Sequence, residues 1–118
     1  MTTELTFSNS DIPSLNVLLR THWTKKAKMQ EALLWKIKQQ TRNRHSGEVI
    51  VTFHRKACKL MDWDNFSGSF KLVGDSLVKS GVIVDDKPDI ITSFIPLQTK
   101  VKKKVEEIIS ITIKDKDL

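Results

Sequence analysis

The protein has 118 residues, which is enough for one domain with a modest core and not for two. Its hydrophobic content of 39% and charged content of 29% are ordinary for a soluble globular protein. No apolar run approaches the ~20 residues that a membrane-spanning helix needs, so we expect no membrane partner. The net charge of +6 favours a polyanionic partner without identifying it.

The cysteine content and the N-terminal segment bear on the compartment. Cys58 is the only cysteine, so an intrachain disulfide and a cysteine zinc site are both excluded, which fits a reducing compartment. The first residues lack the basic and apolar regions of a secretory signal. We therefore expect a cytoplasmic protein.

A short strand and a loop are predicted at the start of the chain. Residues 4–7 alternate polar and apolar side chains, as a half-buried strand does. Residues 8–16 are rich in turn formers and predict a loop. In this loop Ser14 and Asn16 either make local capping and turn hydrogen bonds or position a substrate backbone.

A helix is predicted from Thr21 or Thr24 to Gln40, because apolar residues recur there at helical intervals. Trp23 and Trp35 are interpreted as core or half-buried anchors. The start of this helix is basic, although the helix dipole prefers acids at that end. Either phosphate contact or a solvated charged face accounts for this cluster, which comprises Arg20, Lys25, Lys26 and Lys28.

Two long strands and a final one are predicted in the rest of the chain. In the β-branched run of residues 48–54, Val49, Val51 and Phe53 share one face. Residues 90–98 form the next strand, and Pro96 indicates that this strand either lies at an edge or ends there. The lysine-rich residues that follow, up to the last strand at 108–113, are read as a hairpin tip.

These elements predict a single α/β domain over residues 1–118, with a mixed sheet of about four strands and two main helices. The second helix lies within the segment Met61–Asp86. Its apolar residues are spaced as a helix core stripe, and Gly81 ends it; the stripe comprises Phe66, Phe70, Val73 and Leu77. A short buried strand is expected at Val82–Val84.

Acids are clustered at both ends of that segment, with Asp62 and Asp64 at its start and Asp85 and Asp86 at its end. If residues 61–64 are extended, Asp62 and Asp64 point the same way and Trp63 points to the core. Carboxylates brought together repel unless a cation offsets them, and such a set suits Mg²⁺. Alternatively, the first pair caps a helix and the second forms a turn.

Lys71 is the candidate cation of this segment, because it lies seven residues after Asp64 and shares its helix face. It would neutralise a phosphate or the charge that develops during phosphodiester cleavage. A surface ion pair with Asp75, four residues further on, is the alternative.

In this segment the chain resembles the RusA family of Holliday junction resolvases. The resemblance is carried by an Asp-x-Asp-Asn motif (Asp62, Asp64 and Asn65), followed by Lys71, Gly81 and the pair Asp85-Asp86. The early segment Pro13-Ser14-Leu15-Asn16 is also similar to one near the start of that family. The gap before the lysine is longer than in the best-known member by about one helical turn.

The resemblance implies an Mg²⁺-dependent endonuclease that cleaves four-way DNA junctions as a homodimer. It implies that Asp62, Asp64 and Asp86 bind the metal, that Asp85 assists, and that Lys71 contacts the phosphate. The residues expected to contact DNA are Asn16, Arg20, Lys25, Lys26, Lys102 and Lys103. Two alternatives remain: a junction-binding protein without catalysis on the same fold, and a protein-interaction domain whose charge serves solubility.

Overall fold

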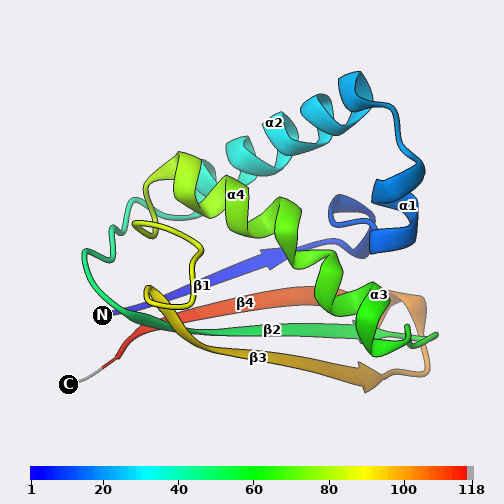
Figure 1. The fold of residues 1–118 in the computed structure, drawn as a ribbon. Coiled ribbons are helices and arrows are strands. Elements are labelled where there is room, and N and C mark those ends of the chain that lie inside the picture. Colours follow the sequence, from blue (N-terminus) through cyan, green and yellow to red (C-terminus); the bar gives the residue numbers. More distant parts are fainter. Residues whose placement is uncertain (117–118) are drawn as a thin grey trace.

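A computed structural model describes residues 1–116, in which four strands form one mixed sheet and helices pack against it (Figure 1). The strands are β1 (Thr2–Phe7), β2 (Val49–Ala57), β3 (Ile91–Lys100) and β4 (Ile108–Asp115). The α-helices are α1 (Leu15–Arg20), α2 (Trp23–Gln40), α3 (Trp63–Gly68) and α4 (Phe70–Ser80). Two 3₁₀ turns are η1 (Asn9–Asp11) and η2 (Lys104–Glu106).

The strands lie in the order β1-β4-β2-β3. β4 pairs antiparallel with both β1 and β2, whereas β2 and β3 are parallel. Parallel neighbours need a crossover connection, and α3 and α4 lie in the connection between these two strands. The predicted α/β domain with a mixed four-stranded sheet and two main helices is confirmed, and α1 and α3 are additional short helices.

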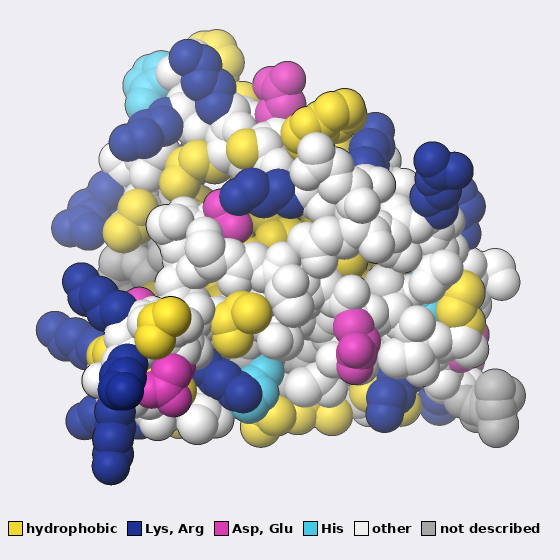
Figure 2. Space-filling view, turned by 180° about the vertical axis from the view of Figure 1, so that it is seen from behind, with side chains coloured by type: hydrophobic (Ala, Val, Ile, Leu, Met, Phe, Trp, Pro, Cys, Tyr) yellow, Lys and Arg dark blue, Asp and Glu magenta, His cyan; other side chains and the backbone are white. Residues whose placement is uncertain are grey.

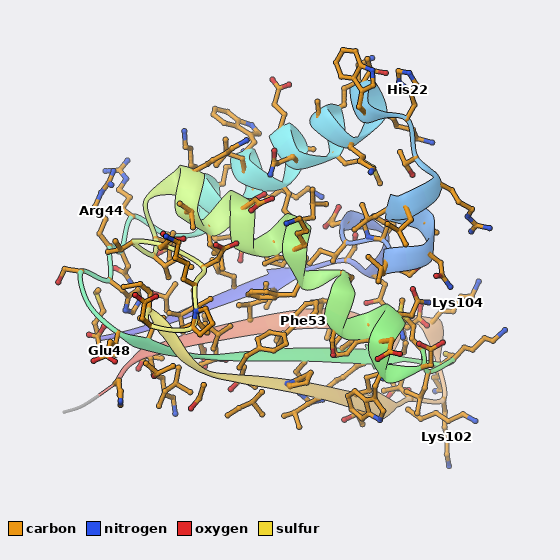
Figure 3. The ribbon with its side chains drawn as sticks, viewed as in Figure 1. His22, Arg44, Glu48, Phe53, Lys102 and Lys104 are labelled. Carbon is orange, nitrogen blue, oxygen red and sulfur yellow. The ribbon has the colours of Figure 1, made fainter. Side chains whose placement is uncertain are left out.

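β3 lies at the edge of the sheet, as Pro96 indicates. The predicted hairpin between the last two strands is wrong, because β2 lies between β3 and β4. The connection instead passes the end of β2, where the Val101 N–H donates to the Ala57 carbonyl at 3.0 Å. This path carries Lys102 and Lys104 to the end of the sheet near α3 (Figures 1 and 3).

One face of the sheet carries the core, and all the helices lie on that side (Figure 1). The predicted alternation of β2 is confirmed, since Val49, Val51 and Phe53 are fully buried. β1 and β4 supply the neighbouring core positions, namely Leu5, Phe7, Ile109, Ile111 and Ile113. On the other face, Ile95 and Leu97 of β3 are 40% and 42% exposed.

The apolar stripe of the central segment is confirmed, but the helix that bears it is interrupted. Phe66 packs on Phe53 with the ring centroids 4.5 Å apart, and Leu77 is fully buried. Two helices, α3 and α4, replace the single helix expected, and they meet at Ser69. There the Ser69 N–H and hydroxyl both donate to the Phe66 carbonyl, an i to i−3 contact that tightens the turn.

α4 ends as predicted at Gly81, whose φ of +82° is the left-handed conformation that glycine adopts freely. The strand expected at Val82–Val84 is wrong. The N–H groups of Val82 and Ile83 both return to the Leu77 carbonyl, at 3.0 and 3.5 Å, and so cannot join the sheet. Both side chains are nevertheless buried.

The expected loop at residues 8–16 is partly helical. Ser14 is the N-cap of α1, and its Oγ accepts the Val17 N–H at 3.3 Å. Capping is therefore the role that the structure gives Ser14. α1 ends at Arg20, and only Thr21 and His22 separate it from the next helix.

α2 begins at Trp23, between the two predicted starts. Trp23 and Trp35 are 72% and 64% exposed, so the interpretation of both as core or half-buried anchors is wrong. Leu33 and Ile37 occupy the inner face of the helix instead. None of the helices within residues 1–116 is long and apolar enough to span a membrane.

Candidate functional site

The first acid of the central segment, Asp62, is the N-cap of α3. Its Oδ1 accepts the Asn65 N–H at 2.8 Å, which satisfies one of the unpaired donors of the first turn. Residues 61–64 are therefore not an extended strand, and the capping interpretation of Asp62 is correct. Its other carboxylate oxygen makes no hydrogen bond to the described residues.

Asp64 lies in the first turn of α3, where a negative charge is favoured by the helix dipole. Because residue 63 begins a helix and is not part of the expected strand, the Trp63 side chain is 55% exposed and does not reach the core. Phe66 takes the core position instead. Both Asp62 and Asp64 are exposed, so each can reach a ligand from solvent.

The two acids share a cavity with the early segment of the chain. The Asn16 N–H donates to Asn65 Oδ1 at 2.9 Å, and this bond connects α1 with α3. Gly68 permits the close approach, because a Cβ there would collide with the Leu15 side chain. The resulting cavity of about 360 Å³ is lined by Leu15, Asn16, Asp62, Trp63, Asp64 and Asn65.

A glutamine that the sequence analysis did not single out fixes the start of this segment. The Met61 N–H donates to Gln98 Oε1, and Gln98 Nε2 donates to the Met61 carbonyl, both at 2.9 Å. The residue just before Asp62 is thereby held on edge strand β3. No local signal marks Gln98, because its partner lies 37 residues away.

Lys71 lies beside a second cavity that adjoins the first. This cavity, of about 230 Å³, is lined by Lys26, Lys71 and Asp75 among mainly apolar residues. Leu15 lines both cavities, whereas Lys71 lines only the second and the acids Asp62 and Asp64 only the first. The structure thus brings Lys71 together with Lys26, another predicted DNA contact.

The other predicted contacts lie around the same end of the molecule. The Arg20 Nε donates to the Asn16 carbonyl at 3.2 Å, which places its guanidinium beside α1. Lys102 and Lys103 are exposed in the connection to β4, and Lys25 is exposed in the first turn of α2. Figure 2 shows many Lys and Arg side chains at the end of the molecule where Figure 3 places Lys102 and Lys104.

Asp85 and Asp86 lie in the segment that connects α4 to β3, just before a turn in which the Ile90 N–H donates to the Lys87 carbonyl at 2.9 Å. The Asp86 N–H donates to Asp85 Oδ1 at 2.7 Å, and this bond holds the pKa of Asp85 below its usual value. The Asp86 carboxylate lies against α4, since a Cβ on Gly74 would be 3.3 Å from its Oδ2. Asp86 is exposed as a residue, but desolvation of its carboxylate against α4, with Asp85 and Asp75 nearby, raises its pKa.

The carboxylates therefore form two groups, one on α3 and one beside α4. Within residues 1–116 no three His, Cys, Asp or Glu side chains are arranged to hold a metal ion. Mg²⁺ is commonly held by one or two carboxylates, with waters and substrate phosphates completing its shell. Asp62 and Asp64, which line one open cavity, meet that requirement; Asp85 and Asp86 do not belong to it in this structure.

No family model matches the chain, and no curated protein matches it. The interpretation of the site therefore rests on the residues and their geometry.

Proposed function

We propose that this protein is an Mg²⁺-dependent endonuclease that cleaves four-way DNA junctions. The observation that carries the proposal is the shared cavity of Asp62 and Asp64 with Asn16 and Asn65. These residues come from the two segments through which the sequence resembles the RusA family. The hydrogen bond between the Asn16 N–H and Asn65 Oδ1 joins these two segments.

In this proposal Asp62 and Asp64 hold the metal, and the N-cap bond of Asp62 orients its carboxylate. When bound, Mg²⁺ would contact a phosphate oxygen, orient the attacking water and stabilise charge on the leaving oxygen. The exposed position of both acids leaves room for a DNA backbone above α3. Asn16 lies at the cavity wall, where its side chain can contact the sugar-phosphate chain.

Lys71 and the surrounding cations would bring the phosphates to these acids. Without them, two carboxylates would repel the DNA backbone. Lys71 and Lys26 line the adjoining cavity and would contact the phosphates that flank the one cleaved. Arg20, Lys25, Lys102 and Lys103 would extend this contact along the junction arms.

Resolution of a junction requires two incisions placed symmetrically, so we propose that the protein acts as a homodimer in the cytoplasm, in recombination and repair. Each protomer would supply one acid cavity. Light scattering coupled to gel filtration tests this part of the proposal by measuring the mass of the protein alone and of its complex with the junction. A complex that contains a single protomer when the protein is in excess would contradict it.

A nicking assay tests the proposed activity. Wild-type protein is incubated with a synthetic four-way junction, with and without Mg²⁺, and with a linear duplex of the same sequence as the control. We expect paired incisions in the junction that depend on Mg²⁺, with the duplex left intact. Junctions that stay intact under these conditions would refute the proposal.

A second candidate is a junction-binding protein that does not cleave. The observation that favours it is that Asp86 does not line the cavity of Asp62 and Asp64, which leaves two acids there and not three. It predicts salt-dependent junction binding. It is distinguished from the first proposal by intact strands after prolonged incubation with Mg²⁺.

A further inference from the structure

We propose that a basic cavity at the opposite end of the sheet is a second binding site for the phosphate backbone of DNA. The cavity has a volume of about 420 Å³ and is lined by Lys38, Arg42 and Arg44, together with the polar residues Thr41, Asn43 and Ser80. Figure 3 places Arg44 at one end of the molecule and Lys102 and Lys104 at the other. The cavity is therefore separate from the one that Asp62 and Asp64 line.

The chain directs the two arginines outward. Exposure alternates along the segment that follows α2: Arg42 and Arg44 are exposed, Asn43 is half-buried and His45 is buried. Asn43 and His45 point inward, toward Thr3. Asn43 Nδ2 donates to Thr3 Oγ1 at 3.0 Å, and His45 Nε2 shares a 2.8 Å hydrogen bond with the same oxygen. Arg42 and Arg44 therefore face solvent, on a segment that buried His45 fixes in place.

His45 fixes that segment through its backbone and through both ring nitrogens. Its N–H donates to the Val82 carbonyl at 2.8 Å. Its ring lies between Thr3 and Asp115, with Nδ1 at 2.7 Å from an Asp115 oxygen. The positions of the flanking arginine backbones are thus set before any ligand binds, which lowers the entropy cost of binding.

The positive charges of this cavity are not neutralised within it, although Arg44 also lines a neighbouring cavity with Glu48 and Asp115. No acid lines it, and within residues 1–116 the side chains of Lys38, Arg42 and Arg44 make no ion pair or hydrogen bond. Three such cations around one cavity repel each other unless an anion binds. Arginine forks match phosphate oxygens in a bidentate geometry.

The helix C-terminus accounts for Lys38, which lies in the last turn of α2, but not for Arg42 and Arg44, which lie beyond it. α2 and α4 both end at this cavity, and cations are favoured at helix C-termini. However, backbone groups already satisfy carbonyls there, since the Thr41 N–H donates to Ile37 and the Gly81 N–H to Val78, at 3.1 and 3.0 Å. The arginine side chains remain free for an external anion.

The dimensions of the molecule favour DNA over a free phosphate. Its longest extent is 36 Å, close to the length of one turn of B-DNA, which is about 34 Å. The basic cavity and the lysines near α3 can therefore contact the same duplex arm about one turn apart. The choice of DNA rests on the proposed function, whereas the phosphate chemistry of the cavity rests on its own residues.

The test measures DNA binding without Mg²⁺, by fluorescence anisotropy of a labelled four-way junction over a series of KCl concentrations. The variants Lys38→Gln, Arg42→Gln and Arg44→Gln each remove one charge from the cavity. The matched control is Lys114→Gln, which removes one charge from the exposed lysine of β4. Thermal unfolding of each variant verifies the fold, and pyrophosphate is added as a competitor in a parallel series.

We expect each cavity variant to weaken binding several-fold and to reduce the slope of log affinity against log salt by about 0.9, the value for one lost phosphate contact. Lys114→Gln should change affinity by less than twofold. Unchanged affinity and slope in folded Arg42→Gln and Lys38→Gln would overturn the inference, whatever Arg44→Gln does to folding. It would equally be overturned if the variants lost only pyrophosphate binding and bound DNA normally.

The outcomes also separate this inference from the proposed nuclease activity. Arginine-dependent binding without any cleavage in Mg²⁺ would support the basic cavity and refute the nuclease. Cleavage that survives with normal affinity in all three cavity variants would support the nuclease and refute the basic cavity.

Discussion

The backbone N–H of Asn16 donates a 2.9 Å hydrogen bond to the side-chain oxygen of Asn65, 49 residues away. This bond joins α1 to α3 beside the two acids of the candidate site. The site is therefore assembled by a long-range contact and not by the Asp-x-Asp motif alone. The short helix α1 serves to position it.

Asn65→Ala should lower the free energy of unfolding by about 1 kcal/mol, since it removes the acceptor of the Asn16 N–H. It should also lower junction cleavage, because the cavity wall is then less well fixed. Asn65→Asp is the matched control, as it keeps an oxygen at the same place. Urea unfolding of both variants provides the measurement, and equal stability of Asn65→Ala and wild type would contradict the role assigned to the bond.

Asp62 has two proposed roles that a pair of substitutions separates. Asp62→Ala should cost about 1 kcal/mol of stability, the usual value of an N-cap side chain, and should abolish cleavage. Asp62→Asn keeps a capping oxygen and should retain nearly all the stability while losing cleavage. The measurements are urea unfolding and junction nicking, and full activity of Asp62→Asn would exclude its carboxylate from the metal site.

Sequence patterns predicted those parts of the fold that depend on neighbours in the chain. The alternation of Val49, Val51 and Phe53 identified the buried face of β2, and Gly81 marked the end of α4. The insertion of β4 between β1 and β2 could not be read in this way, because strand order depends on contacts between distant segments.

The candidate site was predictable in its residues but not in its geometry. Asp62 caps α3 and does not continue a strand, although the residue pattern around it allowed both readings. Trp63 is exposed, because residues 61–64 begin a helix and do not form the extended strand that would have directed it to the core. The contacts of α3 with α1, namely the Asn16–Asn65 hydrogen bond and the packing of Gly68 against Leu15, join distant segments and are revealed by no local pattern. The pairing of Gln98 with Met61 was missed for the same reason.

Asp86→Asn tests whether the carboxylate beside Gly74 belongs to the metal site. The pKa of Asp86 is raised in the fold, so its contribution to stability is fully present below the unfolded pKa of about 3.9 and is lost as pH rises through the folded value. Asp86→Asn should therefore be more stable than wild type at pH 7 and equally stable near pH 3. It should also reduce cleavage less than Asp64→Asn does.

Thermal or urea unfolding at the two pH values, together with the nicking assay, provides the measurement for Asp86→Asn. Loss of cleavage as complete as that of Asp64→Asn would show that Asp86 joins the metal site. A variant less stable than wild type at pH 7 would contradict the electrostatic account of its position.

Gly81→Ala should destabilise the fold by about 1–2 kcal/mol, the cost of a left-handed residue that carries a Cβ. The new methyl group would also collide with the Arg44 guanidinium and displace it from the basic cavity. Gly47→Ala is the matched control, because nothing lies within 4 Å of the Cβ it adds. Urea unfolding of the two variants is the comparison, and equal losses would exclude a special role for Gly81.

The most direct test of the central claim is the cleavage of a synthetic four-way junction in Mg²⁺ by wild type and by Asp64→Asn. Asp64 is exposed and makes no capping bond, so the substitution should leave the fold intact, and it should not weaken junction binding because it removes a charge that repels the DNA backbone. We predict paired, Mg²⁺-dependent incisions by wild type and none by Asp64→Asn. Intact junctions with both proteins, or equal cleavage by both, would contradict the claim.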